Sequence, residues 1–199
     1  MTKVNLPVFR LNIGELDETG IDLISIVDKP AIEANFIKLE EEVQPLKLSS
    51  NQEKQYVTGP VLIPDQLIYR KTEKEEFYIT ASAQDIEKIR NKFLKQGQLK
   101  LSNLDHSSND EIPGYLIESW IVEDASNDKA VALGFTDVKP GTLFATYHFP
   151  DAKVWAEVSK RNGFSLEGNF LMEAIKMSTQ KQDTVESLLE ELLDALENK

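Results

Sequence analysis

The pattern of apolar and polar positions predicts one helix with defined ends near the middle of the chain. Apolar residues recur along one face at intervals of three and four: Ile86, Ile89 and Phe93. Ser82 and Asp85 fit a capping box at its start, and Gly97 stands where a left-handed C-cap belongs. We therefore expect a helix between Ser82 and Gly97. A second helix is expected from Asp151 through Lys160.

Most other segments alternate apolar and polar residues or are rich in β-branched residues, which predicts strands. These segments are separated by turn residues and lie at 4–13, 21–28, 56–70, 76–82, 99–106, 115–124, 143–149 and 163–171. The strands at 99–106, 115–124 and 143–149 look antiparallel. Strands interleaved with two or three helices indicate an α+β fold, with a mostly antiparallel, β-rich sheet or a partly closed barrel.

The same pattern divides the chain into four parts. Residues 1–40 are expected to form a strand segment that packs on the body as an added edge, and the polar, aperiodic residues 41–56 to form a linker. Residues 57–172 make up the core. Residues 173–199 read as a second linker followed by an acidic amphipathic helix, whose leucine stripe faces either its own domain or a partner.

Composition excludes several classes of function. The 199 residues carry a net charge of -12, which repels phosphate backbones and anionic lipid, so neither nucleic acid nor a membrane is an expected partner. No cysteine is present, and the start of the chain lacks the apolar region of a secretory signal, which favours a cytoplasmic protein. Two histidines without helical pairing, and no glycine-rich phosphate loop, predict no metal and no cofactor.

His106 and Glu118 are the first candidates for chemistry. His106 ends the strand 99–106, where a side chain reaches a cleft. Alternation places Glu118 on one face with Leu116 and Trp120, so that it needs a hydrogen-bonding partner. If the two strands pair, Glu118 lies close enough to orient the imidazole. The alternatives are a structural histidine and a partly exposed glutamate at a sheet edge.

Ser165 is the third candidate. It lies in the segment GFSLEG, where Gly163 and Gly168 allow close backbone approach and Glu167 shares its face. A nucleophilic serine needs such access, although the segment is not a nucleophile-elbow motif and an ordinary serine fits it too. His148 reads as a structural residue that a Ser-His-His arrangement would recruit.

Several short motifs follow one another in a specific order: LISIVDKPAIE (23–33), VTGPVLIPD (57–65), DH (105–106), ESWIVED (118–124), PGT (140–142) and GFSLEG (163–168). This ordered set resembles the phage serine proteases of the XkdF-like branch, which are relatives of the prohead, or capsid maturation, proteases. The resemblance extends from about residue 4 to about residue 172 and does not include the acidic end of the chain.

This resemblance implies a fold similar to that of the herpesvirus assemblin proteases, which is a mostly antiparallel, β-barrel-like core with surrounding helices. It also implies a serine nucleophile with a histidine base. On that basis Ser165 attacks the scissile carbonyl, and His106 takes its proton and passes it to the leaving amine. Glu118 is expected to steady the imidazole. The other candidates for this third position are Asp124, Glu167 and His148.

The family also implies a place and substrates. Such an enzyme cleaves scaffold and major capsid protein inside the assembling phage prohead, in the cytoplasm of the host bacterium, and forms dimers. The C-terminal helix is expected to tether it to scaffold or shell. A noncatalytic head-assembly or scaffold-like binding protein on the same fold is the alternative function, and an ordinary esterase is a third.

Overall fold

The computed structural model describes residues 6–14, 19–28, 49–51, 54–71, 75–97, 99, 102–105 and 112–175. In chain order the elements are β1 (Val8–Asn12), β2 (Gly20–Val27), β3 (Ser49–Asn51), β4 (Tyr56–Leu62), β5 (Ile68–Lys71), β6 (Glu76–Thr80), α1 (Ala83–Gln96), β7 (Ser102–Leu104), β8 (Tyr115–Ile121), α2 (Lys129–Ala132), β9 (Leu143–His148), α3 (Ala152–Val158), β10 (Gly163–Asn169) and β11 (Leu171–Ile175). The fold is therefore α+β and consists mostly of sheet, as expected.

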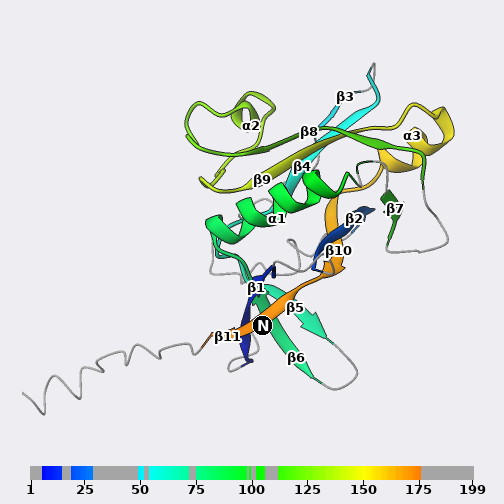
Figure 1. The fold of residues 1–199 in the computed structure, drawn as a ribbon. Coiled ribbons are helices and arrows are strands. Elements are labelled where there is room, and N and C mark those ends of the chain that lie inside the picture. The colour runs from blue at the N-terminus through cyan, green and yellow to red at the C-terminus, as the bar shows by residue number, and fades with distance from the viewer. Residues whose placement is uncertain are drawn as a thin grey trace, which may run out of the picture.

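The strands form three sheets (Figure 1), with the orders β11-β1-β6-β5, β10-β2-β7 and β3-β4-β9-β8. Neighbours are antiparallel except for the β1–β6 and β2–β7 pairs, so the mostly antiparallel prediction is confirmed. The barrel prediction is wrong, because the sheets do not close on one another within the described chain. Two of the outermost strands, β3 and β7, have three residues each and offer few ladder hydrogen bonds for closure.

The two N-terminal strands are central to their sheets. β1 lies between β11 and β6, and β2 lies between β10 and β7. The sequence analysis had treated this segment as an edge added to a body that starts near residue 57. That prediction is wrong, because β1 and β2 each have a paired strand on both sides and are therefore inner strands. Their partners come from distant parts of the chain.

Two boundaries also differ from the prediction. β3 and the first residue of β4 lie inside the segment 41–56 that was expected to be a linker, and they pair with each other. β11 continues to Ile175, past the expected end of the core, because it is antiparallel to β1. The predicted amphipathic helix at the C-terminal end lies outside the described residues.

The expected hairpin between the strands that carry His106 and Glu118 is absent from the described ladders. β7 pairs in parallel with β2, and β8 pairs with β9. Among the described residues, backbone hydrogen bonds between the two segments run from the Ile112 N–H to the Ser102 carbonyl and from the Leu116 N–H to the Leu99 carbonyl. The two strands therefore belong to different sheets, β7 to the sheet of β2 and β8 to the sheet of β9.

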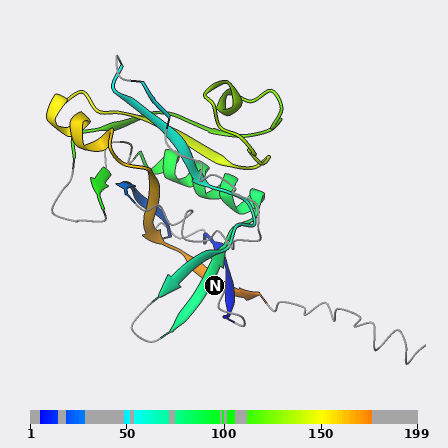
Figure 2. The same cartoon turned by 180° about the vertical axis from the view of Figure 1, so that it is seen from behind.

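Helix α1 has the ends that the sequence predicts. Ser82 Oγ accepts from the Asp85 backbone N–H, the Asp85 carboxylate accepts in return from the Ser82 N–H, and Gly97 is left-handed with φ 71°. Arg90 ties the helix to β8, donating to the Ser119 carbonyl at 2.7 Å and to its hydroxyl at 3.0 Å. The capping box and this anchor fix the helix between the sheets (Figure 2).

The main hydrophobic core lies around the inner face of α1. That face is buried and consists of Ile86, Ile89 and Phe93. It contacts β1, β2 and β9, which belong to three different sheets. Removal of apolar surface from water stabilises the fold by roughly 25 cal/mol per Å². Burial of this face therefore helps to hold the three sheets together.

A smaller apolar cluster lies under α2, a short helix between the strands expected at 115–124 and 143–149. Phe144 is fully buried and stacks on Trp120, with ring centroids 5.0 Å apart. Trp120 Nε1 donates to the Asp128 carboxylate, which also caps α2. The other predicted helix is confirmed as α3. No helix among the described residues combines the length and apolar character needed to cross a bilayer.

β10 and β2 approach each other closely at Gly168. A Cβ at this position would lie 2.0 Å from the carbonyl oxygen of Gly20, a distance that no side chain tolerates. The register of β10 shifts between Glu167 and Gly168 at the same place. Glycine is therefore the residue that this approach of β2 to β10 requires.

Candidate functional site

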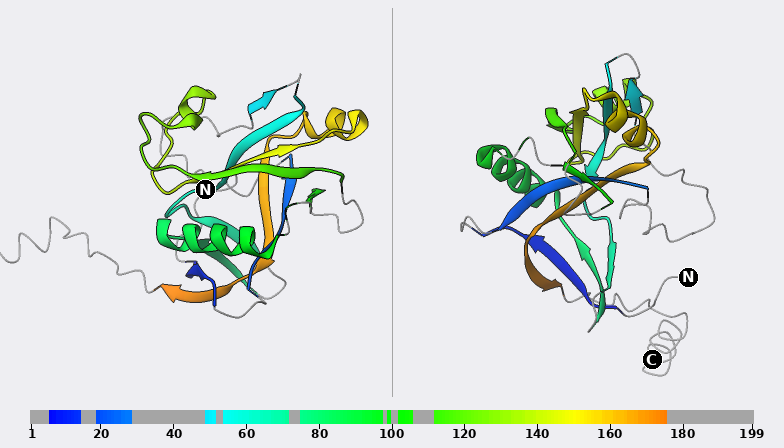
Figure 3. Two further views of the ribbon diagram at one scale, coloured as in Figure 1. Left: turned by 45° about the horizontal axis from the view of Figure 1, so that its top comes forward. Right: turned by 90° about the vertical axis from the view of Figure 1, so that its right-hand side faces the viewer.

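Ser165 lies in a line of polar side chains that crosses the β10-β2-β7 sheet, in which β2 is the middle strand (Figure 3). The register places Ser165 opposite Ser25, and Ser25 opposite Asn103. All three are buried, with exposed fractions of 5%, 0% and 1%. Facing residues of neighbouring strands point to the same side of a sheet, so these three side chains share one face.

Glu167 adds a carboxylate to this line, because it lies two positions after Ser165 on the same strand. Ser25 Oγ donates to Glu167 Oε1 at 2.5 Å, and Asn103 Nδ2 donates to the same oxygen at 3.0 Å. Two donors on one oxygen fix the carboxylate and stabilise its charge. We call Ser25, Asn103, Ser165 and Glu167 the polar row.

The polar row and the main core lie on opposite faces of this sheet. Phe164 and Leu166 flank Ser165 along β10, and both belong to the main core or pack against it. Ile24 and Ile26 flank Ser25 in the same way on β2. Because successive side chains of a strand point to opposite faces, the polar row faces away from the core.

Asn103 leaves one acceptor open in the polar row. Its Nδ2 group bonds to Glu167, which fixes the orientation of the amide, and its Oδ1 atom is buried with no hydrogen-bond partner in the described chain. An unsatisfied buried acceptor costs about 1–3 kcal/mol. The polar row therefore combines a hydroxyl, a held carboxylate and an amide oxygen that can accept one further N–H or O–H group.

The strand that leads to His106 belongs to the same sheet. Leu104, the last residue of β7, pairs with Ile26, and the Asp105 backbone N–H donates to the Ile26 carbonyl at 3.1 Å. His106 follows Asp105 in the chain and itself lies outside the described residues. The fold thus brings β7 and β10 into one sheet, with β2 between them.

Glu118 does not belong to this group. It lies on β8, in another sheet, where it forms an ion pair with Lys129 and exposes 40% of its side chain. The register of β8 shifts between Leu116 and Glu118, which breaks the alternation that had placed Glu118 among apolar residues. Its partner is a surface lysine of α2, and the structure does not bring it to Ser165.

Asp124 and His148 have partners of their own. Asp124 is exposed in a loop, and hydrogen bonds from the Asn127 side chain and then from the Ser126 backbone lower the pKa of its carboxyl. His148 Nδ1 lies 2.8 Å from Tyr115 Oη, in the same sheet as Glu118. Of the acids weighed from the sequence, only Glu167 lies in the polar row.

A pocket of about 110 Å³ lies beside β10. Phe164, Leu166, Gly168 and Phe170 line it at alternate positions, Ser165 borders it, and apolar residues of β1, β4, β5 and β6 complete the wall. The alternate positions mark the core-facing side of β10. The pocket therefore lies on the core-facing side of β10, and Ser165 is the residue of the polar row that also lines it.

Arg70 is the charged residue in the wall of that pocket. Its Nη1 group donates to the carbonyl of Tyr69 at 3.2 Å, and burial lowers the pKa of its guanidinium. Arginine nevertheless keeps its proton inside proteins. The pocket thus pairs an apolar wall with one positive charge.

The sequence analysis missed Ser25 and Asn103. Both are polar residues within short apolar runs, ISI for Ser25 and SNL for Asn103. A polar side chain in a buried strand requires a hydrogen-bonding partner, and that requirement was the available signal. The sequence of neither run indicates which residue that partner is, because Glu167 lies more than sixty positions from both Ser25 and Asn103.

Two further searches complete the description of the site. Within the described ranges, no three or more histidine or acidic side chains gather as a metal-binding group. Comparison of the chain with protein-family models and with curated proteins, and of the fold with solved structures, found no match. The residues of the polar row and the ordered motifs of the chain are therefore the features that bear on its function.

Proposed function

We propose that this chain is a serine endopeptidase in which Ser165 is the nucleophile and His106 the general base. The observation that carries the proposal is the polar row, in which a serine lies two residues from a carboxylate held by two donors. Strand β7, which is separated from β10 by β2, ends two residues before His106 in the chain. A hydroxyl, an imidazole and an orienting carboxylate are the parts that acyl transfer by serine requires.

In this proposal Glu167 takes the role that the sequence analysis gave to Glu118. Its carboxylate reaches across β2 to Asn103 on β7, the strand that precedes His106. A carboxylate in that position accepts the N–H of the imidazole and holds the tautomer that can take a proton. Ser25 and Asn103 then position Glu167, and the Asn103 amide oxygen accepts one more donor from the base or the substrate.

The reaction follows from these roles. Ser165 Oγ attacks the scissile carbonyl carbon, and His106 takes the hydroxyl proton as the C–O bond forms. His106 then gives that proton to the leaving amine as the C–N bond breaks. Water enters, loses a proton to His106 and hydrolyses the acyl-enzyme, which restores the serine hydroxyl.

The wider assignment follows the ordered motifs of the chain. By that resemblance the enzyme has an assemblin-like core and acts inside the phage prohead, in the host cytoplasm, on scaffold and major capsid protein. Confinement would limit its targets. The leucine stripe of residues 183–199, which lies beyond the resemblance, predicts a helix that would tether the enzyme to scaffold or shell. Deletion of residues 183–199 should then abolish incorporation into proheads while peptide cleavage continues.

Coexpression tests the proposal. The coat and scaffold proteins encoded in the same genome are produced with the wild type, with Ser165→Ala and with Ser126→Ala, a matched change at an exposed serine. We expect shortened products with the wild type and Ser126→Ala, and none with Ser165→Ala. Identical band patterns in all three would refute the endopeptidase.

The burial of Ser165 favours a second candidate function. With 5% of its surface exposed, this serine is reached by a polypeptide only if the face that carries the polar row opens. A noncatalytic head-assembly or scaffold-like binding protein on the same fold needs no such opening. It predicts capture of coat or scaffold with unchanged bands, whereas an ordinary esterase predicts hydrolysis of small esters without cleavage of either protein.

A further inference from the structure

The pocket beside β10 lies where the three sheets meet. Its walls come from β1, β5 and β6 of one sheet, from β10 of another and from β4 of the third. Its volume is about 110 Å³. Because a cavity of about 150 Å³ holds one benzene molecule, this space holds a chain of about four carbon atoms. The pocket is thus large enough for a short aliphatic chain and too small for a long one.

Arg70 takes a core-facing position in the wall of this pocket. On β5 it alternates with Ile68, which is buried, faces Ile79 of β6 and lines the same pocket. Arg70 itself faces Phe77, a residue of the main core. Residues two positions apart on a strand share a face, so the Arg70 side chain starts on the apolar side of its sheet.

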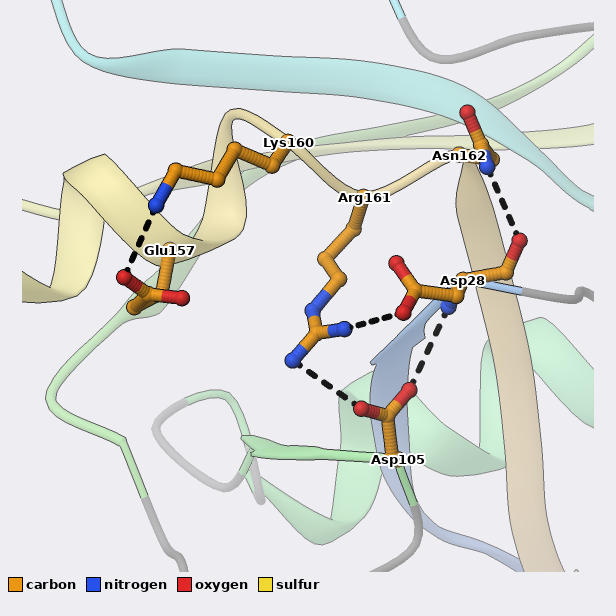
Figure 4. Close-up of polar contacts among 6 residues, drawn as sticks. All are labelled: Asp28, Asp105, Glu157, Lys160, Arg161 and Asn162. Carbon is orange, nitrogen blue, oxygen red and sulfur yellow. Dashed lines mark hydrogen bonds and ion pairs between the residues drawn. The ribbon is translucent and has the colours of Figure 1, made fainter.

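Arg161 shows how this fold pairs a half-buried arginine (Figure 4). Its Nη1 group pairs with Asp28, which follows β2, and its Nη2 group lies 3.0 Å from Oδ2 of Asp105, which follows β7. Arg161 itself precedes β10, so it joins the ends of all three strands of that sheet. Its side chain is 19% exposed. Two carboxylates thus compensate the charge that burial takes out of water.

Arg70 has no such compensation. Its Nη1 group donates to the Tyr69 carbonyl at 3.2 Å, and its Nε and Nη2 groups have no hydrogen-bond partner in the part of the chain that the structure describes. Arg90, another half-buried arginine, donates from all three of its nitrogen atoms. A guanidinium keeps its charge inside a protein, and a buried charge is normally paired. The Nε–Nη2 edge of Arg70 is therefore available to an anion, which it can hold with two parallel hydrogen bonds.

We propose that this pocket binds a short aliphatic monocarboxylate, whose chain lies against the apolar walls and whose carboxylate pairs with Arg70. The two parts of such a ligand match the apolar lining and the uncompensated positive charge. The net charge of -12 opposes an anion only weakly at this site, because salt screens charges that lie beyond about 8 Å. This binding goes beyond the proposed function, because it uses neither the Ser165 hydroxyl nor His106.

Titration of the full chain with a series of acids tests the site. Acetate, butanoate, pentanoate and heptanoate are added at constant ionic strength, and the amide chemical shifts give the dissociation constant of each. Pentanamide is the matched neutral probe, since it has the same chain as pentanoate without the charge.

The same probes are titrated into three variants, Arg70→Gln, Lys71→Gln and Leu166→Phe. Lys71 is the matched control, because it follows Arg70 in the chain but pairs with Glu76 and has a side chain that is 67% exposed. Leu166 lines the pocket, so Leu166→Phe takes up space in it and leaves Arg70 in place.

We expect the affinity to rise about fourfold per methylene from acetate to pentanoate, which is the effect of burying one CH₂ group. Heptanoate should gain nothing more, because the pocket is then full. Arg70→Gln should weaken pentanoate binding about 10- to 100-fold through the lost hydrogen bonds to a charged group, and Lys71→Gln should leave it unchanged. Pentanamide should bind the wild type and Arg70→Gln equally weakly. Leu166→Phe should weaken pentanoate binding more than acetate binding.

The opposite results overturn the proposal. They are no saturable binding of pentanoate to the wild type, equal affinities for pentanamide and pentanoate, or equal weakening by Arg70→Gln and Lys71→Gln. A continued gain up to heptanoate would place the chain outside the pocket and overturn it too. Should Arg70→Gln not fold, Leu166→Phe decides, and wild-type affinity for pentanoate in that variant overturns the site. None of these results bears on the endopeptidase, which Ser165→Ala tests.

Discussion

Two glutamates on strands, Glu118 and Glu167, look alike in the sequence and have different surroundings in the fold. Each alternates with apolar residues, and each was a candidate for the acid that orients a histidine. Glu118 exposes 40% of its side chain and pairs with Lys129. Glu167 accepts hydrogen bonds from two buried side chains, Ser25 and Asn103. The neighbouring strands, and not the strand itself, therefore determine which partners a carboxylate has.

The physical reason is that the two glutamates lie in different sheets, whose strands pair differently. β8 pairs only with β9 among the described strands, and the shift in its register leaves Glu118 beside α2. β10 pairs with β2, which in turn pairs with β7, so polar residues of three strands meet on one face. A surface ion pair contributes at most about 1 kcal/mol, whereas buried donors fix a charge in place.

The largest expected difference comes from changing each glutamate to glutamine. Glu167→Gln keeps an acceptor oxygen but removes the charge that orients the base, so we expect labelling by a fluorophosphonate, which reacts covalently with an activated serine, to slow by about 10³–10⁴-fold. Glu118→Gln should leave the rate unchanged and lower the free energy of unfolding by less than about 1 kcal/mol. Labelling kinetics and urea unfolding measure the two effects.

If Glu118→Gln slows labelling and Glu167→Gln does not, Glu118 on β8 is the acid that orients the base, and the assignment of Glu167 is wrong. Equal small effects would mean that neither glutamate serves the chemistry. Urea unfolding of both variants is the control, because it separates lost activity from lost fold.

The next effect concerns the apolar cluster under α2, the helix whose Lys129 pairs with Glu118. Phe144 is fully buried and contacts the rings of Trp120 and Phe135, with centroids 5.0 and 5.1 Å away. Phe144→Ala should lower the free energy of unfolding by about 3–5 kcal/mol through lost burial and a cavity. Denaturant titration measures this loss, and a loss below about 1 kcal/mol would show that the α2 cluster is not a packed core.

The smallest effect concerns a buried hydroxyl on β9. Tyr147 is fully buried, and its Oη atom has no hydrogen-bond partner in the described chain, unlike the paired hydroxyl of Ser25. Tyr147→Phe removes this unsatisfied group and should raise the free energy of unfolding by about 1 kcal/mol. Thermal unfolding at neutral pH measures the gain, and a loss of stability would indicate a partner for the hydroxyl.

The same residue predicts a dependence on alkaline pH. Burial raises the pKa of Tyr147 above its ordinary value near 10. Above that pH the unfolded chain ionises this tyrosine while the folded chain does not, so its contribution to stability is present below about pH 10 and lost as the pH rises. Tyr147→Phe should therefore lose less stability than the wild type between about pH 9 and 11.

Local signals allowed part of this fold to be predicted. The capping box at Ser82, the apolar spacing of α1 and the left-handed Gly97 depend on residues within one turn of each other, and all three were confirmed. The place of most strands and the mostly antiparallel pairing were also predicted. Such features depend on short-range sterics and hydrogen bonds, which the sequence displays directly.

The candidate site was predicted only in part, because its geometry depends on pairing across long separations. Ser165 and Glu167 were named from their own strand. Ser25 and Asn103 were missed, and Glu118 was preferred because a hairpin between β7 and β8 was expected. Parallel pairing of β7 with β2 replaced that hairpin. No local pattern distinguishes those two partners.

By itself the sequence determined an acidic α+β chain without cysteine, a well-capped central helix and a serine between glycines on a strand. Only the tertiary structure decided that β1 and β2 are central, that Glu167 and not Glu118 shares a face with Ser165, and that Arg161 joins the ends of three strands. Helix caps and strand periodicity are encoded by neighbours in the chain. The assembly of a site from strands more than sixty residues apart depends on which edges pair, and burial of the whole core settles that choice.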